Sequence, residues 1–157
     1  MLNNDKFPYD LAGEGWEVAI AKPSAFDGAT AGARGNDGGA LDPLILFTVT
    51  GDVIVRIFGV CTTLLAGATA TLSVGVAGNT AGLIALTTAT DIDADEIWND
   101  ATPVLGVELL SNILGPYLVI NGLDINEYVA TENITSGQIY YVCFWRPLSG
   151  DGKVVGS

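Results

Sequence analysis

The chain is 157 residues long, carries a net charge of −12 and contains no histidine. Its six basic residues are scattered, so no basic patch is available to attract nucleic acid or an anionic membrane surface. Without histidine there is no Ser-His-Asp or Cys-His pair, no usual general base at neutral pH and no imidazole metal ligand. We therefore expect a protein that is not an enzyme and that holds no cofactor or metal ion.

Length and composition also limit the fold. A chain of 157 residues suits one domain and can bury about 68–70% of its unfolded surface, so its core needs no disulfide or metal. Twenty glycines, with Val, Ile, Thr and aromatic residues between them, favour strands and turns over a helical bundle. The first residues show no signal-peptide pattern, and charges or glycines interrupt every apolar run. We expect synthesis in the cytoplasm without export.

The first 41 residues differ in texture from the rest of the chain. Glycines recur through them, and only residues 16–21 alternate like a strand. Disordered tails are poor in aromatic residues, yet this region contains several. We expect residues 1–41 to form an arm that orders on its own surface or a neighbour's, ahead of a domain of residues 42–157. The residues predicted to contact a partner or a second copy are Phe7, Tyr9, Trp16, Phe26 and Arg34.

From residue 44 onward the chain alternates between strand and turn. Successive side chains of a strand point to opposite faces, so Val53, Val55, Ile57 and Cys61 should share one face. The last strand is expected at residues 137–147. The strands predicted in this region are residues 44–50, 53–63, 69–76, 82–89, 96–101, 117–120, 125–131 and 137–147.

These strands and their turns predict the fold class. Asn121-Gly122 is typical of a hairpin turn, so residues 117–120 and 125–131 are predicted to pair. Residues 104–114 would suit a short helix, although Gly106 and Pro116 restrict it. About eight strands with turns every eight to twelve residues predict an all-β sandwich of antiparallel strands, jelly-roll-like, with an extended N-terminal arm.

The two cysteines, Cys61 and Cys143, lie within apolar runs. The simpler interpretation is two buried thiols that act as small hydrophobic side chains, and the alternative is a disulfide between strands. Two cysteines are too few for a secreted disulfide scaffold.

The densest acidic cluster spans residues 91–96 and begins like a calcium loop. It departs from that motif because Glu96 replaces the sixth-position glycine and Thr102 replaces the bidentate glutamate at the twelfth position. We expect a solvated acidic turn, with weak calcium binding as the alternative.

A carboxylate pair for glycoside hydrolysis would come from Asp93, Asp95, Glu96 or Asp100, but no spacing selects a pair. A sugar-stacking platform would use the tyrosines with Trp16, Trp98 and Trp145, although such residues more commonly fill the core and the subunit contacts.

Four stretches carry a resemblance to a known group of proteins. They read LILFTVTGDVIVRIFGVCTT, ATLSVGVAGNTAGLIA, TTATDIDADEIWNDATP and ITSGQIYYVCFWRPLSGDG. They resemble head decoration, or cement, proteins of tailed bacteriophages, which are often jelly rolls. The resemblance extends from residue 44 to about residue 152 and is weakest over residues 104–129.

The resemblance implies a structural role without catalysis. Copies would bind the outer face of the phage capsid and brace neighbouring capsomers, with the major capsid protein and the chain itself, as a homodimer or homotrimer, for partners. The protein would be made in the host cytoplasm and reside on the capsid surface of the virion, which its acidic excess suits. The alternative is a tail-associated or head-fibre module that binds a receptor or glycan.

Overall fold

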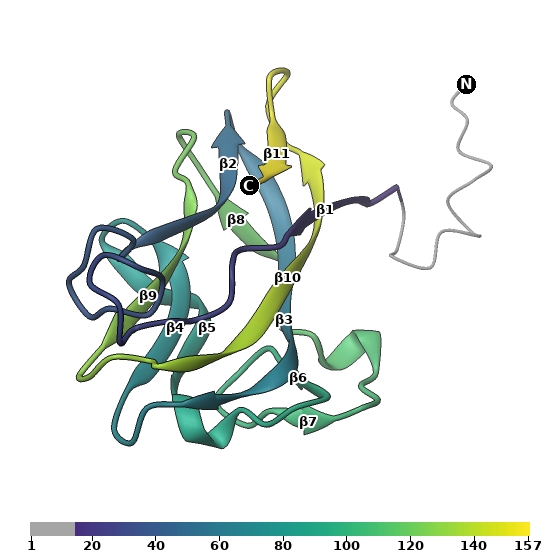
Figure 1. Ribbon diagram of the computed structural model, residues 1–157. Coiled ribbons are helices and arrows are strands. Elements are labelled where there is room, and N and C mark those ends of the chain that lie inside the picture. The colour runs from purple at the N-terminus through teal and green to yellow at the C-terminus, as the bar shows by residue number, and fades with distance from the viewer. Residues whose placement is uncertain (1–14) are drawn as a thin grey trace.

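The computed structural model describes residues 15–157 and shows two antiparallel β-sheets with the hydrophobic core between them (Figure 1). The predicted all-β sandwich is therefore confirmed. The first sheet has the order β1-β10-β3-β6-β7, with β8 also paired to β3, and the second has the order β11-β2-β9-β4-β5. Strands of the first sheet are β1 (Glu17–Ala21), β3 (Val53–Ala66), β6 (Glu96–Trp98), β7 (Val104–Leu105), β8 (Tyr117–Val119) and β10 (Ser136–Pro147). Strands of the second are β2 (Leu44–Thr50), β4 (Thr71–Val76), β5 (Asn79–Thr88), β9 (Ile125–Ala130) and β11 (Lys153–Gly156).

The long pair β3 and β10 forms the centre of the first sheet. Burial alternates along both strands, so one face of each lies in the core and the other is partly exposed. The predicted face of β3 is confirmed, because Val53, Val55, Ile57 and Cys61 are all buried. The apolar alternation in the sequence is enough to explain this sheet, since a shift of one residue would turn its buried side chains to solvent.

The predicted hairpin at Asn121-Gly122 is wrong, although the turn itself forms. Both residues have positive φ, as an Asn-Gly turn requires. The strands on either side then separate, because β8 pairs with β3 in the first sheet whereas β9 pairs with β2 and β4 in the second. The turn binds another turn instead: the Asn121 amide donates to Asp52 Oδ1 over 2.9 Å and the Gly122 amide to the Gly51 carbonyl over 2.9 Å.

Two further predictions are wrong: the short helix at residues 104–114 and the position of the last strand. Residues 104–114 form no α-helix: they contain β7 and a single 3₁₀ turn, η3 (Leu110–Asn112). Gly106 has a positive φ, which breaks any helix there. The strand at residues 136–147 is also not the last, since β11 follows and pairs with β2. Its four residues are too few to produce a recognisable alternation.

The segment between β1 and β2 packs against the chain's own sandwich. β1 pairs with β10 along its whole length, which confirms a strand at the predicted position. After it, the Phe26 amide donates to Gly137 O and the Gly28 amide to Ile134 O, both over 2.9 Å, and the Ile134 amide donates to Gly35 O over 2.8 Å. The described part of the predicted arm, residues 15–41, thus orders on its own surface, beside the connection between β9 and β10.

The two lateral edges of the sandwich differ. At one edge, here called the closed edge, β1 of the first sheet lies against β11 and β2 of the second. Gly156 approaches the Ile20 carbonyl so closely that a Cβ atom would collide with it, and the Ser157 amide donates to Leu46 O over 3.0 Å. At the other, the open edge, β5 ends the second sheet, β8 pairs only with β3 of the first, and no described strand pairs with the outer side of either.

Candidate functional site: a buried clamp and an uncharged open edge

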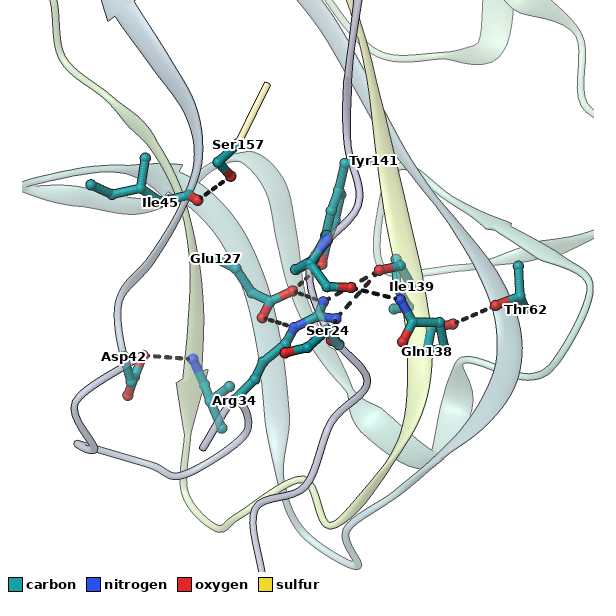
Figure 2. A network of polar contacts seen from close by, with 12 residues as sticks. Ser24, Arg34, Asp42, Ile45, Thr62, Glu127, Gln138, Ile139, Tyr141 and Ser157 are labelled. Carbon is teal, nitrogen blue, oxygen red and sulfur yellow. Dashed lines mark hydrogen bonds and ion pairs between the residues drawn. The ribbon is translucent and has the colours of Figure 1, made fainter. Parts of the chain in front are cut away.

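A buried ion pair joins the two sheets and the segment between β1 and β2 (Figure 2). Arg34 Nε donates to Glu127 Oε1 over 2.9 Å, and Nη2 donates to Oε2 over 2.5 Å, so the pair is bidentate. The Tyr141 hydroxyl donates to the same Oε2 over 2.5 Å, and Arg34 Nη1 donates to the Ser24 carbonyl over 2.6 Å. Glu127 belongs to β9 and Tyr141 to β10, so this group of residues, the Arg34 clamp, ties a loop to both sheets.

Local sequence explains how the clamp is positioned. Glu127 shares a face of β9 with Ile125 and Val129, both buried, so the strand carries its carboxylate into the core. Arg34 is followed by Gly35, which has a φ of +105° and lies so close to the Ile134 carbonyl that a Cβ atom would collide with it. Only glycine suits that position, and the tight path there holds the arginine over the sandwich interior.

The pKa shifts in the clamp keep Arg34 charged and Tyr141 neutral, as expected for residues that stabilise the fold. Burial lowers the pKa of Arg34, but the charge and hydrogen bonds of Glu127 outweigh burial, so the pKa lies above its ordinary value. Burial and the neighbouring Glu127 charge hold the pKa of Tyr141 well above its ordinary value. Both groups therefore keep one protonation state over the physiological range, and the guanidinium also lies 3.8 Å from the Phe26 ring centroid.

The described residues that were predicted to contact a partner make contacts within their own chain. Phe7 and Tyr9 lie outside the described residues. Trp16 is half-buried, and the Arg146 guanidinium lies 5.0 Å from its ring centroid. Phe26 and Arg34 are 3% and 1% exposed, so their side chains are engaged inside their own chain.

Sequence reasoning missed the partner of Arg34. Glu127 was not among the predicted site residues, yet a signal was present, because an alternating strand placed a carboxylate between two core positions. A buried carboxylate requires a cation or several hydrogen-bond donors. With six basic residues in the chain, few partners were available.

The cysteines are free and buried, which decides between the two alternatives in favour of thiols. Burial raises the pKa of Cys61 to about 11, and burial likewise raises the pKa of Cys143. Both groups stay protonated at neutral pH, so neither is an activated nucleophile.

The acidic cluster at residues 91–96 forms local turn contacts. Glu96 Oε2 accepts the Asp93 amide over 2.8 Å, and after the cluster Asp100 Oδ1 accepts the Thr102 amide and hydroxyl, both over 2.7 Å. Within residues 15–157, no three acidic or cysteine side chains lie close enough together to hold a metal ion. In the same part of the chain, every buried side-chain nitrogen and oxygen has a hydrogen-bond partner.

Two of the three tryptophans considered for a sugar platform fill the core, as does Tyr141, whereas Tyr117, Tyr128 and Tyr140 are partly exposed. Trp98 is fully buried and Trp145 nearly so. The Trp98 indole N–H donates to Thr87 Oγ1 over 2.9 Å, which joins β6 of the first sheet to β5 of the second. Its ring lies 6.3 Å from that of Tyr141, centroid to centroid.

A chain excursion that begins with β7 and leads to β8 carries apolar side chains into solvent. This excursion, residues 104–116, is ordered: Arg56 Nη1 donates to the Ile113 carbonyl over 2.8 Å, and the Leu114 amide donates to Asn99 Oδ1 over 3.3 Å. Glu108 is its only charged residue. Its exposed apolar side chains are Leu105, Val107, Leu109, Leu110 and Leu114, with Val107 82% exposed.

A partly open groove of about 240 Å³ lies at the open edge, between the β4–β5 hairpin and β8. All of its lining residues are uncharged: Val76, Asn79, Gly82, Leu83, Tyr117, Leu118, Val119, Ile120 and Leu123. Sequence reasoning missed this groove because its two walls belong to different sheets. The one available signal was charge, since no charged residue occurs from residue 57 to residue 90.

Comparisons with known proteins add no relative: no protein-family model, curated protein or solved structure matches this chain. Among residues 15–157, no helix is both long enough and apolar enough to cross a membrane.

Proposed function

We propose that this chain is a structural protein of a phage virion, a decoration protein that binds the outer face of the capsid and braces neighbouring capsomers. Its strand order supports a jelly roll as the scaffold. Eight of the strands form two four-stranded sets, β1-β10-β3-β6 and β2-β9-β4-β5, and the chain passes between them repeatedly. Two facing sets of four antiparallel strands, linked in Greek keys, are the arrangement of a jelly roll.

The observation that carries the proposal is the apolar surface of the β7–β8 excursion. Single exposed apolar residues are normal, but five exposed apolar side chains on one segment of thirteen residues favour a protein-binding surface. Hydrogen bonds from Arg56 and to Asn99 hold this segment in place. Docking it on another protein would cost little ordering entropy and would remove several leucine and valine side chains from water.

The Arg34 clamp supports the mechanical part of the role. A brace between capsomers must transmit load without deforming. A bidentate ion pair between the β1–β2 segment and β9, closed by a tyrosine of β10, links these three elements from inside the core, in addition to the backbone hydrogen bonds between the segment and β10. Repetition of one weak contact by the symmetry of a capsid would then give strong holding in total.

Binding to phage heads that lack decoration tests the proposal. The wild-type chain should co-sediment with such heads and raise the temperature at which they rupture. Val107→Asp and Leu109→Asp should weaken binding, because each would bring an unpaired charge into an apolar contact. Leu148→Asp provides the matched control, since Leu148 is 56% exposed but lies in the β10–β11 turn. Heads that bind no wild-type protein and gain no rupture temperature would refute the proposed function.

The alternative, a receptor-binding or glycan-binding module of a tail or head fibre, has weaker support. Such a module would use exposed aromatic rings for sugar stacking. Trp98 and Trp145 are instead buried, and Trp16 is half-covered with Arg146 over its ring. No observation in the described residues favours this alternative over the first.

A further inference from the structure

We infer that residues 1–14, which precede the described part of the chain, lie across the outer face of the first sheet and cover it. This outer face is the side turned away from the core, and it is formed by β1, β10, β3 and β8, which pair in that order. The inference goes beyond the proposed function and does not rest on it, because it concerns a contact within one chain.

The outer face is apolar, although that side of an antiparallel sheet usually faces water. Strands with one solvated face alternate between apolar and polar side chains, whereas strands covered on both faces are apolar nearly throughout. β3 and β10 follow the second pattern. On this face the ring centroids of Phe58 and Phe144 lie 6.0 Å apart. Val18, Ile20 and Leu118 lie on either side of them and are 53%, 47% and 59% exposed. The remaining outward positions are held by Ile54, Arg56, Val60, Tyr140, Val142 and Arg146.

The second sheet shows a solvated outer face in the same protein. Both sheets enclose one core, so burial of that core does not explain a difference between their outer faces. The paired outward positions of β4 and β9 are mostly small or polar, and the residues there are Thr71, Ser73, Gly75, Asn126, Tyr128 and Ala130. The apolar outer face of the first sheet therefore requires a cover that the second sheet does not need.

The described chain begins on this side of the sheet. Trp16 lies directly before β1, and the Arg146 guanidinium lies 5.0 Å from its ring centroid. Arg146 is at an outward position of β10, so the Trp16 ring lies on the outer side as well. Three strand spacings of about 4.8 Å separate β1 from β8, a distance that about five extended residues span. Residues 1–14 are long enough to cross the face, and their covalent link gives them a high effective concentration beside it.

The sequence of residues 1–14 complements the outer face in pattern and in charge. Phe7, Tyr9 and Leu11 alternate with other residues, so an extended backbone would turn all three side chains toward the sheet. Three of the four charged residues in the segment are acidic. The outward positions of the four strands carry two arginines, Arg56 and Arg146, and no acidic residue, in a chain whose net charge is −12. An acidic segment with an apolar stripe is therefore the fitting occupant.

Photo-crosslinking of the full chain in dilute solution tests the position of the segment. Phe7→p-benzoylphenylalanine should form cross-links within one chain to β3, β8 or β10. Their yield should exceed that to β4 and β9 by at least about tenfold, because a tethered contact outweighs chance encounters. Leu86→p-benzoylphenylalanine is the control. Leu86 is 54% exposed on β5, so this probe should label the second sheet instead.

Binding of the dye ANS measures whether the segment covers the outer face. Phe7→Ser combined with Leu11→Ser should raise the fluorescence of bound ANS at least about twofold, because this dye reports exposed apolar surface. Asn3→Ser combined with Asn4→Ser is the matched control, since it changes the same segment without removing an apolar side chain. Circular dichroism should give the wild-type spectrum for both, because the changes lie outside the sandwich.

Equal cross-linking yields on the two sheets would overturn the inference, and so would the absence of cross-links. A cross-linked dimer as the main product would also overturn it, because the outer face would then be covered by the segment of a neighbouring copy. Equal ANS fluorescence for the two double variants would show that Phe7 and Leu11 cover no apolar surface. All of these measurements use the isolated protein, so their failure leaves the head-binding test of the proposed function unaffected.

Discussion

The closed and open edges of the sandwich are stabilised in different ways. At the closed edge and the adjoining strands β10 and β9, the chain brings together segments far apart in sequence and fixes them with close backbone contacts and the Arg34 clamp. At the open edge, β5 and β8 each pair with one described strand only, and a groove with an uncharged lining lies between the β4–β5 hairpin and β8. The comparison indicates that buried polar contacts fix the closed edge, whereas the open edge keeps an uncharged and partly exposed apolar surface.

The largest test of this comparison removes the charge of Glu127. Glu127→Gln keeps the shape of the side chain but leaves Arg34 buried without its anion, which should lower the free energy of unfolding by about 3–5 kcal/mol. Urea denaturation followed by tryptophan fluorescence measures the loss. Glu17→Gln, at an exposed position of β1, is the control and should change little. A double variant with Arg34→Met should recover part of the loss, and no recovery would mean that the pair matters for another reason.

A smaller loss is expected from the tyrosine that completes the clamp. Tyr141→Phe removes the hydroxyl that donates to Glu127 and should cost about 1.5–3 kcal/mol, the usual range for a hydrogen bond to a charged group. Tyr140→Phe on the opposite face of the same strand is the control for chemical denaturation. Equal losses of unfolding free energy for the two variants would show that the buried Tyr141 hydroxyl does not stabilise the protein through Glu127.

The backbone contact at the closed edge gives a third test. Gly156→Ala would place a Cβ atom against the Ile20 carbonyl, and the displacement needed should cost about 1–3 kcal/mol. Gly150→Ala is matched to it, because no atom lies within 4 Å of the position a Cβ would take there. Thermal unfolding that shifts equally for both variants would contradict a tightly packed closed edge.

Alkaline pH should destabilise the protein through its buried thiols. The pKa of Cys61 is raised by burial to about 11 from an ordinary 9.0, and burial raises the pKa of Cys143 in the same direction. Unfolded thiols therefore ionise first, so this contribution to stability is complete below pH 9.0 and is lost as the pH rises toward 11. Cys143→Ala should make the fall in unfolding free energy with pH less steep. If the unfolding free energy fell equally steeply with pH in the wild type and in Cys143→Ala, ionisation of the buried Cys143 thiol would not be the cause.

The smallest effect is expected at the surface proposed for binding. Leu109→Ser changes an exposed side chain of the excursion and should alter the free energy of unfolding by no more than about 0.5 kcal/mol. Calorimetry of the isolated protein measures it. A loss as large as that of Tyr141→Phe would show that the excursion supports the fold, and the contrast between the two regions would fail.

Local patterns predicted much of the fold. Alternation located β3 and β10, and it identified the buried face of β3, because a strand with one face in the core needs that pattern. The Asn121-Gly122 turn was also correctly read as a turn, but the pairing of its flanking strands depends on contacts with Gly51 and Asp52 far away in sequence. Sequence neighbours decide where a strand turns, and distant contacts decide which sheet it joins.

The candidate site was harder to predict for the same reason. Arg34 was predicted to contact a partner or a second copy, and the structure shows it buried against Glu127 of its own chain. The groove between β5 and β8 requires knowledge of which strands end each sheet, and no periodicity contains that information. Its one trace in the sequence, the absence of charge over residues 57–90, became meaningful only once the edges were known.

The Arg34 clamp also affects the order in which the chain can fold. Arg34 and Glu127 are 93 residues apart, so their pairing closes a long loop and needs most of the polypeptide to be present. The β4–β5 hairpin joins neighbouring residues and can form quickly. We expect the β4–β5 hairpin to form early during synthesis. The Arg34 clamp should form late, after β9 and β10 have been made. Chains stalled before β9 would then expose apolar surface and carry an arginine without its anion.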